Sequence, residues 1–369
     1  MRRVSLARKN LFQDRRRATL AIFGVGAAFV LVLVLDGIFA GAMNQVAAYI
    51  RHSPADVFVA QRNVKTMHMT ASALPPSTLE NVRAVDGVAW AEGLRFTTST
   101  VNVGSNSLLT YVLGYDTTTS RGGPRRIASG RAPGAEQAVV DSSAADELGV
   151  TVGDVVTILG RPFTISGLST GGTNIVNTSV FVTSDDFAKL RGPTYAYLLV
   201  GARADTPVSV LERRLQRVLP QTTVMSRPQF AAQEANVVRS MAADVMAIMT
   251  AIGFLIALAL IGLTLFTSTI SKQREYGILK ALGANTRRLS AIVVAQAAWT
   301  IALALVVAVA LSLAIGAAIG ALTPNLEVDV ELNSIVRTCA SALVIGSLAA
   351  LLPLRRVTRV DPATAFRRP

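Results

Sequence analysis

The sequence is poor in the residues that form disulfides and bind metals. Its 369 residues include one cysteine, Cys339, and two histidines, His52 and His68. A single cysteine excludes an intrachain disulfide and a thiolate metal cluster. Neither histidine has neighbouring ligands at the spacing of a zinc site. We therefore expect no metal, and we expect both histidines to have a surface or membrane-proximal role.

Motifs for nucleotide binding and for metalloprotease catalysis are missing as well. The chain contains no G-x-x-x-x-G-K-[ST] phosphate loop and no H-E-x-x-H metalloprotease motif. Because that loop supplies the backbone amides that hold nucleotide phosphates, this chain is not expected to bind ATP itself. We predict no catalytic residue and no cofactor in it.

Charged residues are scarce, at 16%, and the two signs are unequal, with 36 Lys and Arg against 23 Asp and Glu. Such an excess often indicates a nucleic-acid partner. Here, however, residues 1–17, 271–290 and 355–369 together carry 17 basic and 3 acidic residues. Because Lys and Arg beside membrane spans mark the cytoplasmic side, this pattern predicts a topology with both termini in the cytoplasm, and no nucleic acid.

Four apolar stretches are long enough to cross a bilayer core of about 30 Å, which takes roughly 20 helical residues. They are residues 18–43, 245–270, 291–322 and 335–354. The prediction is a membrane protein with four transmembrane helices and an inserted extracytoplasmic domain at 44–240. The other parts are a cytoplasmic amphipathic segment at 1–17, a cytoplasmic loop at 271–290, a short outer loop at 323–334 and a cytoplasmic tail at 355–369.

Two alternatives affect the number of spans. The first stretch could be a cleaved signal peptide, because Ala40-Gly41-Ala42 resembles a cleavage site. Its apolar run of about 25 residues exceeds the roughly 7–15 of a signal peptide, which favours an uncleaved anchor. The third stretch could be two spans, but two crossings need about 40 residues. A fifth crossing would also place the arginines of the tail outside.

Residues 44–240 have the composition of a soluble domain. Short alternating or β-branched runs predict nine strands, at residues 55–60, 96–103, 108–115, 137–141, 155–159, 163–168, 179–183, 195–201 and 222–225. Gly160 and Arg161 predict a tight hairpin turn, and residues 208–218 have helical apolar spacing. We expect an α+β domain that could form two lobes.

The end of this domain predicts a helical stalk. Residues 229–270 contain no proline, and their only glycines are Gly253 and Gly262. A continuous helix of this length would measure roughly 63 Å, of which half would project beyond the membrane. Such a stalk could transmit movement between the outer domain and the cytoplasmic loop. The alternative is two helices with a bend near Met241.

The cytoplasmic loop has an amphipathic pattern of its own. We expect a helix up to Leu282, with Gly283 as its C-cap. Tyr276, Leu279 and Gly283 fall on one side, and Ile278 and Leu282 lie next to them. This arrangement favours either a helix that rests on lipid headgroups or one that docks into a groove on a soluble partner.

Residues 272–284 read Lys-Gln-Arg-Glu-Tyr-Gly-Ile-Leu-Lys-Ala-Leu-Gly-Ala. They resemble the E-x-G-I-L-(R/K)-A-L-G-A signature that follows the second span of FtsX/MacB-type (type VII) ABC transporter permeases. Residues 354–367 resemble the closing R-x-x-R-x-D-P-x-x-A-L-R of that family, with Phe366 for the usual Leu. Residues 6–11 resemble its opening L-A-x-R-N-L segment.

The outer domain is similar to the same family, though less specifically. Residues 130–154 resemble the family's domain, and residues 53–59 are loosely similar to its DevC-like branch. The resemblance thus covers the whole chain in order, and its specific part is the loop signature together with the tail.

The resemblance implies a permease subunit in the bacterial inner or plasma membrane. It would form a homodimer or heterodimer, contact membrane lipids and work with two copies of a separate ATPase that binds ATP and Mg²⁺. An envelope protein outside the membrane is a further partner that the family admits. The loop helix would contact the ATPase through the residues at the signature positions, which are Glu275, Tyr276, Gly277, Leu279, Lys280 and Gly283. Glu275 and Lys280 would make polar contacts, Tyr276 and Leu279 would fill an apolar groove, and Gly277 would permit close approach.

Polar and small residues within the spans suggest other roles. Asp36 and Asp244 lie near the outer interface, where an ion site is one reading and a solvated or paired acid is another. Gly37 and Gly41, with the G-x-x-x-G spacing, could pack against a second copy in a dimer. Gly316 and Gly320 repeat that spacing.

Three functions compete. The first is mechanotransmission, in which ATP hydrolysis changes the shape of the outer domain and exports or extracts a hydrophobic or envelope-destined molecule. The second is an FtsX-like signal relay that activates a cell-wall hydrolase without transport. The third is a receptor or scaffold without an ATPase, which would leave the loop signature unexplained.

Overall fold

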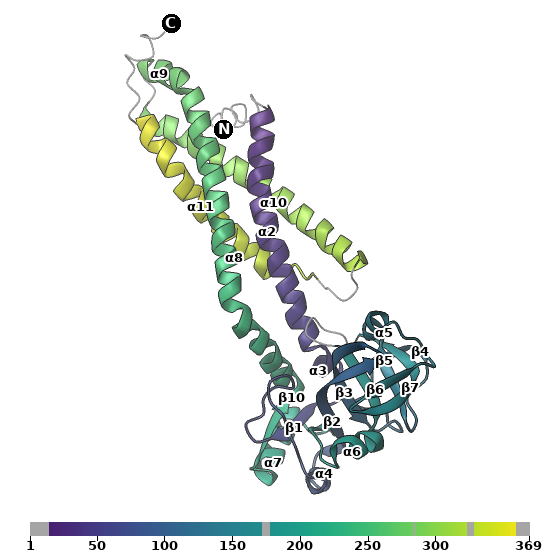
Figure 1. Ribbon diagram of the computed structural model, residues 1–369. Helices are drawn as coiled ribbons and strands as arrows, with labels where there is room; N and C mark the ends of the chain where they lie inside the picture. The colour runs from purple at the N-terminus through teal and green to yellow at the C-terminus, as the bar shows by residue number, and fades with distance from the viewer. Residues whose placement is uncertain (1–14, 172–177, 283–284, 323–327, 359–369) are drawn as a thin grey trace. The chain divides into compact units, whose positions relative to one another are not determined.

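The computed structural model describes residues 15–171, 178–282, 285–322 and 328–358 (Figure 1). The chain forms two compact units, one made of residues 1–41 and 242–369 and the other of residues 42–241. Most of the predicted amphipathic N-terminal segment, most of the tail motif, and Gly283 lie outside the described residues.

Long helices make up the first unit, and two of them continue into the second. They are α2 (Arg15–Val46), α8 (Arg227–Ser271), α10 (Thr286–Leu322) and α11 (Leu332–Thr358), with the shorter α9 (Gln273–Ala281) between α8 and α10. Among the described residues, four helices are long and apolar enough to cross a membrane, over Ile22–Val46, Ala243–Ser271, Leu289–Leu322 and Leu332–Ala349. The four predicted spans are confirmed, and the third apolar stretch is one helix.

Small side chains hold the helices of this unit together. The buried cluster consists of Val25, Ala28, Phe29 and Leu33 of α2, Ala257, Ile261 and Leu265 of α8, Ala297, Ile301, Ala304 and Ala308 of α10, and Ala342, Ile345 and Ala349 of α11. A Cβ atom at Gly253 would lie 2.5 Å from Val32, and one at Gly346 would lie 2.3 Å from Ile301. Alanine and glycine therefore allow the close backbone approach on which packing between membrane helices depends.

The predicted stalk and second span form a single element. Helix α8 has 45 residues and passes through Met241 without interruption. At 1.5 Å per residue its length is about 68 Å. The continuous helix predicted from the absence of proline is confirmed, and it starts two residues earlier than the sequence indicated.

The second unit is built on one mixed sheet with ten strands, in the order β10-β1-β9-β2-β3-β8-β5-β7-β4, while β6 pairs with β2 and β7. The strands are β1 (Val57–Gln61), β2 (Val88–Val103), β3 (Asn106–Tyr115), β4 (Arg126–Gly130), β5 (Gln137–Asp141), β6 (Val155–Ile158), β7 (Arg161–Thr170), β8 (Thr178–Thr183), β9 (Tyr197–Ala202) and β10 (Thr222–Ser226). Parallel pairs join β3 to β8 and β5 to β7, and the other pairs are antiparallel. The α+β fold class is confirmed.

Short helices cover the sheet in two groups. Helices α5 (Ser142–Leu148) and α6 (Ser184–Arg191) accompany the β3, β5, β7 and β8 part, whereas α4 (Pro76–Arg83) and α7 (Val208–Val218) accompany β2 and β10 (Figure 1). Each group has its own buried cluster, around Val140 and Ile165 in one case and around Leu198 and Leu211 in the other. The sheet thus continues through both groups, and each group has its own core.

A third buried cluster of the second unit contains residues from both segments that connect the two units. Helix α3 (Ala48–His52), which follows α2, contributes Ile50, and the first turns of α8 contribute Phe230 and Ala231. The Phe230 ring lies 5.0 Å from that of Phe58 and 5.6 Å from that of Tyr197, measured between ring centres. Both chain connections are therefore anchored in the same aromatic core of the outer domain.

Candidate functional site

The residues predicted to contact an ATPase lie on α9, a helix of nine residues. It follows α8 after a single residue, Lys272, whose N–H donates to Ser268 O at 3.2 Å. At the other end Leu282 is the C-cap, and its N–H donates to Ile278 O at 3.0 Å. The prediction that Gly283 caps the helix is wrong by one residue, because the helix ends at Ala281. Gly283 itself lies outside the described residues.

One face of α9 is open to solvent. Glu275 is exposed, the Ile278 side chain is 39% exposed and the Leu282 side chain 80% exposed. Their spacing of three and four residues places them on one side of a helix. Gly277 is buried and Lys280 is half-buried on the other side. The structure thus brings an acidic residue and two apolar residues together on the exposed face.

Sequence reasoning predicted an apolar ridge on this helix. It centred the apolar ridge on Tyr276 and Leu279, whose backbones belong to α9, with Ile278 and Leu282 beside them. The structure adds that Ile278 and Leu282 are exposed. Both residues are part of the quoted signature, but periodicity alone could not say which side of so short a helix is open.

Glu275 also has an electrostatic role within the chain. Burial lowers the pKa of Lys272, the N-cap residue of α9, while the charge of Glu275 opposes that effect. A cation at a helix N-terminus meets the positive end of the helix dipole, and an acidic residue in the first turn offsets it. Glu275, although it is exposed, therefore also stabilises the start of α9.

The outer ends of the spans hold a polar contact that the sequence reasoning missed. Asp36 of α2, whose side chain is 12% exposed, forms an ion pair with Arg337 of α11. Asp36 had been recognised as an acid near the outer interface, but its partner lies 301 residues away. The contact explains how an acid is tolerated there, because a paired charge costs far less than an isolated one in a membrane.

The glycines predicted to pack in a dimer have neighbours in the same chain. A Cβ atom at Gly37 would lie 3.0 Å from Val328, and one at Gly316 would lie 3.4 Å from it. The N–H of Asp329 donates to Gly37 O at 3.0 Å. Gly41 is buried. Packing of a second copy against Gly37 and Gly41 stays a prediction, and at Gly37 a second copy would share the surface with Val328.

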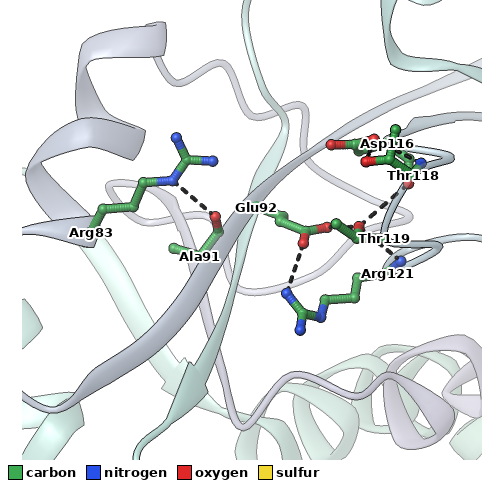
Figure 2. A network of polar contacts seen from close by, with 7 residues as sticks. All are labelled: Arg83, Ala91, Glu92, Asp116, Thr118, Thr119 and Arg121. Atoms are coloured by element: carbon green, nitrogen blue, oxygen red, sulfur yellow. Dashed lines mark hydrogen bonds and ion pairs between the residues drawn. The ribbon is translucent and has the colours of Figure 1, made fainter.

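Polar residues of the outer domain form a compact network around Glu92 (Figure 2). Glu92, on β2, is 7% exposed and accepts hydrogen bonds from Thr119 Oγ1 at 2.6 Å and Arg121 Nη1 at 2.9 Å. The Arg121 guanidinium also lies 4.3 Å from the centre of the Trp90 ring. These contacts fix the loop after β3 on β2. Because both Glu92 oxygens are engaged, the network is suited to holding a loop in place rather than to acid–base chemistry.

One match to a hydrolase motif has no catalytic geometry. Gly167-Leu168-Ser169-Thr170-Gly171 has the G-x-S-x-G spacing of a nucleophile elbow. That motif requires an exposed serine at a sharp turn from strand to helix. Ser169 is 1% exposed and lies within β7. Among the described residues, no group of three or more His, Cys, Asp or Glu is placed to hold a metal ion.

Comparison with known families decides what kind of protein has this arrangement. The model of the MacB-like periplasmic core domain matches residues 18–235, more than half of the chain, and that of the FtsX-like permease C-terminal domain matches residues 247–362. The chain is a permease of the MacB/FtsX type. This membership confirms the family that the loop signature indicated. The permease is thus the membrane subunit of an ABC transporter, and such subunits are non-catalytic and work with an ATPase partner.

Relatives of similar length support the same assignment. Two uncharacterized ABC transporter permeases of Mycobacterium tuberculosis (strain ATCC 25618 / H37Rv) are each 26% identical to the permease, over 95% of this chain and 96% of their own length. A permease of Mycobacterium bovis (strain ATCC BAA-935 / AF2122/97) matches over the same shares with the same identity.

Two solved structures resemble the outer domain. The extracellular domain of the noncanonic ABC-type transporter YknZ from Gram-positive bacteria has 14% identity and a TM-score of 0.38, covering 46% of this chain and 99% of that chain. The periplasmic region of MacB from Actinobacillus actinomycetemcomitans has 15% identity and a TM-score of 0.39, covering 48% of this chain and 92% of that chain.

Proposed function

We propose that the permease transmits ATP-driven movement from a separate ATPase, through α9 and α8, to the outer domain. The ATPase would bind ATP and Mg²⁺, and the movement would export or extract a hydrophobic or envelope-destined molecule. In this proposal both termini are cytoplasmic, and a second copy of the chain completes a homodimer. The basic residues within 1–17, 271–290 and 355–369 lie beside the spans, and this pattern supports a cytoplasmic location for both termini.

The observation that carries the proposal is the continuity of α8. The helix begins at Arg227, places the fully buried Phe230 in the aromatic core of the outer domain, and ends at Ser271. Only Lys272 separates it from α9. Because an α-helix is stiff along its axis, displacement at one end is passed to the other over about 68 Å.

The exposed face of α9 supports the site of ATPase contact. Glu275, Ile278 and Leu282 present one charged and two apolar side chains in a line, which is the pattern of a helix that docks into a groove. Glu275, Tyr276, Gly277, Leu279, Lys280 and Gly283 remain the proposed contacts by position in the signature. Ile278 and Leu282 are added to them because they are exposed.

Charge reversal tests this assignment. In the variant Glu275→Arg with Lys280→Glu, the permease should still insert into the membrane but should recruit and stimulate its ATPase much less. The measurement is co-purification of the ATPase, followed by its turnover in nanodiscs. Glu147→Lys, an exposed acid on α5, is the matched control. Unchanged recruitment and turnover in the double variant would refute α9 as the contact.

Transport and signalling are separated by a second measurement. If the permease moves a molecule, adding candidate lipids or lipopeptides should raise ATP turnover in nanodiscs that contain no envelope protein. An FtsX-like relay should instead respond to a cell-wall hydrolase and not to such candidates.

A further inference from the structure

Glu234, two turns into α8, is the one acid of that helix within the outer domain, and it is fully buried. Its carboxylate accepts hydrogen bonds from Met67 N at 2.6 Å and from His68 N at 3.3 Å. It also contacts His68 Nδ1. All three donors belong to the segment of residues 62–75, which connects β1 to α4. We call this set of contacts the Glu234 clamp.

The clamp is a costly arrangement unless every contact is made. A carboxylate removed from water loses much hydration, and hydrogen bonds that it accepts must replace that loss. Burial lowers the pKa of His68 to about 4. The ring is therefore neutral at pH 7, and the contact is a hydrogen bond to the carboxylate rather than an ion pair. The His68 ring also meets the Tyr111 ring edge-on, with 4.8 Å between ring centres.

Strand pairing gives the clamped segment little support. Residues 62–75 contain no regular helix or strand, and their one sheet-like contact is the bridge between Leu74 and Tyr195. Met67 and Val64 are buried in the aromatic core, and Tyr197 Oη donates to Thr66 O at 3.1 Å. The middle of the segment thus depends on α8 and on side-chain packing rather than on strand pairing.

The segment is also one wall of a small cavity. Met67 and His68 line it, together with Tyr49 of α3, Phe96 of β2 and Tyr111 of β3. Its volume of about 20 Å³ leaves room for roughly one water molecule. A shift of residues 62–75 would therefore change this cavity directly. Its other walls are strands β2, β3 and β8, which are paired within the sheet, and the helical residues Gln45, Val46 and Tyr49.

We propose that the Glu234 clamp is the joint at which movement of α8 enters the outer domain, so that residues 62–75 and the cavity they border move with the helix. The inference rests on the proposed function, because it assumes that α8 moves when the ATPase binds ATP. By contrast, the first turn of α8 is tied to the start of β1, through Arg227 N to Asp56 O at 2.9 Å and Arg227 Nη1 to Ser53 O at 2.9 Å. The clamp lies closer to the membrane portion of the helix than that tie does.

Backbone hydrogen exchange at Met67 and His68 tests the clamp, because their N–H groups are its donors. The full permease with its ATPase in nanodiscs would be compared without nucleotide and with ATP bound to a hydrolysis-deficient ATPase. In the native chain, ATP should change exchange at these two amides. In Glu234→Gln, exchange there should already be about tenfold faster without nucleotide, since a charge-assisted hydrogen bond is lost, and the ATP-dependent change should disappear.

Two further variants complete the design. Gln233→Ala, an exposed neighbour on α8, should behave as the native chain does. His68→Ala removes one of the three contacts and should give a partial effect, and it carries the test if Glu234→Gln does not fold. If ATP alters exchange elsewhere in residues 42–241 but Met67 and His68 respond equally in native and variant chains, the clamp is not the joint. If ATP alters nothing in residues 42–241 of the native chain, the proposed function itself fails.

Discussion

The environment of His68 changes its protonation. Its side chain is 14% exposed, and burial lowers its pKa from 6.5 to about 4. The unfolded chain therefore binds a proton between these two pH values that the folded chain does not bind. The contribution of His68 to the free energy of unfolding is complete above pH 6.5 and is lost as the pH falls toward 4. The slope is up to about 1.4 kcal/mol per pH unit for one proton.

This linkage can be isolated because the chain has only one other histidine, the exposed His52. Thermal unfolding of the detergent-solubilised permease would be followed between pH 6.5 and pH 4. His68→Gln should lose less stability over that range than the native chain, and His52→Gln should lose as much as the native chain. Equal slopes for all three proteins would show that His68 is protonated in the folded state as readily as in the unfolded one.

Polar contacts between distant residues show what the sequence alone could not reveal. Asp36 is visible in the sequence as an acid in an apolar stretch, whereas Glu234 lies in a polar stretch. Their partners, Arg337 and His68, are distant in the chain. Hydrophobic patterning reports which face of an element is buried and carries no information on contacts between elements. The motif at Glu275–Lys280 was found because its residues are consecutive, and the exposure of Ile278 and Leu282 required the structure.

At the scale of elements, α8 is the feature on which the proposed transmission depends. Met241 is 69% exposed, so its replacement removes little packing. Met241→Pro would break the helix there, at a cost of about 3 kcal/mol, by removing one backbone hydrogen bond and clashing with the preceding turn. We expect the ATPase to co-purify as before, while ATP no longer alters the protease sensitivity of the outer domain.

The control for this variant is Met241→Ala, which keeps the helix and should preserve the response to ATP. A response that survives in Met241→Pro would mean that movement reaches the outer domain by another route, for example through α2 and α3.

Most elements were predictable from local pattern. The four spans, the continuous α8, helix α7 and the hairpin between β6 and β7 follow from hydropathy, from the absence of proline and from turn glycines. In that hairpin Leu159 and Gly160 both have positive φ, 51° and 79°, as a tight turn between paired strands requires. The turn lies one residue earlier than predicted, because Arg161 already belongs to β7 and pairs with Ile158. Strand β4 was missed because it is an exposed edge strand, whose five residues show no alternation of buried and exposed side chains.

At the scale of the whole molecule, the predicted parts belong to a permease of the MacB/FtsX type, with its apolar helices in one unit and its mixed sheet in the other. The order of the strands in that sheet could not be predicted, because β9 lies between β1 and β2 and β8 lies between β3 and β5. Such pairings join segments far apart in the chain and depend on packing rather than on any local signal.

The most direct test of the account measures the distance between the two units as the ATPase works. Spin labels would replace Glu147 of α5 and Val294 of α10, both exposed, in a Cys339→Ser background. Labelled chains would be diluted with unlabelled ones and assembled with the ATPase in nanodiscs. The account predicts that ATP shifts the distance distribution and that hydrolysis restores it. The same distribution with and without ATP, in a complex that hydrolyses ATP, would contradict transmission through α8.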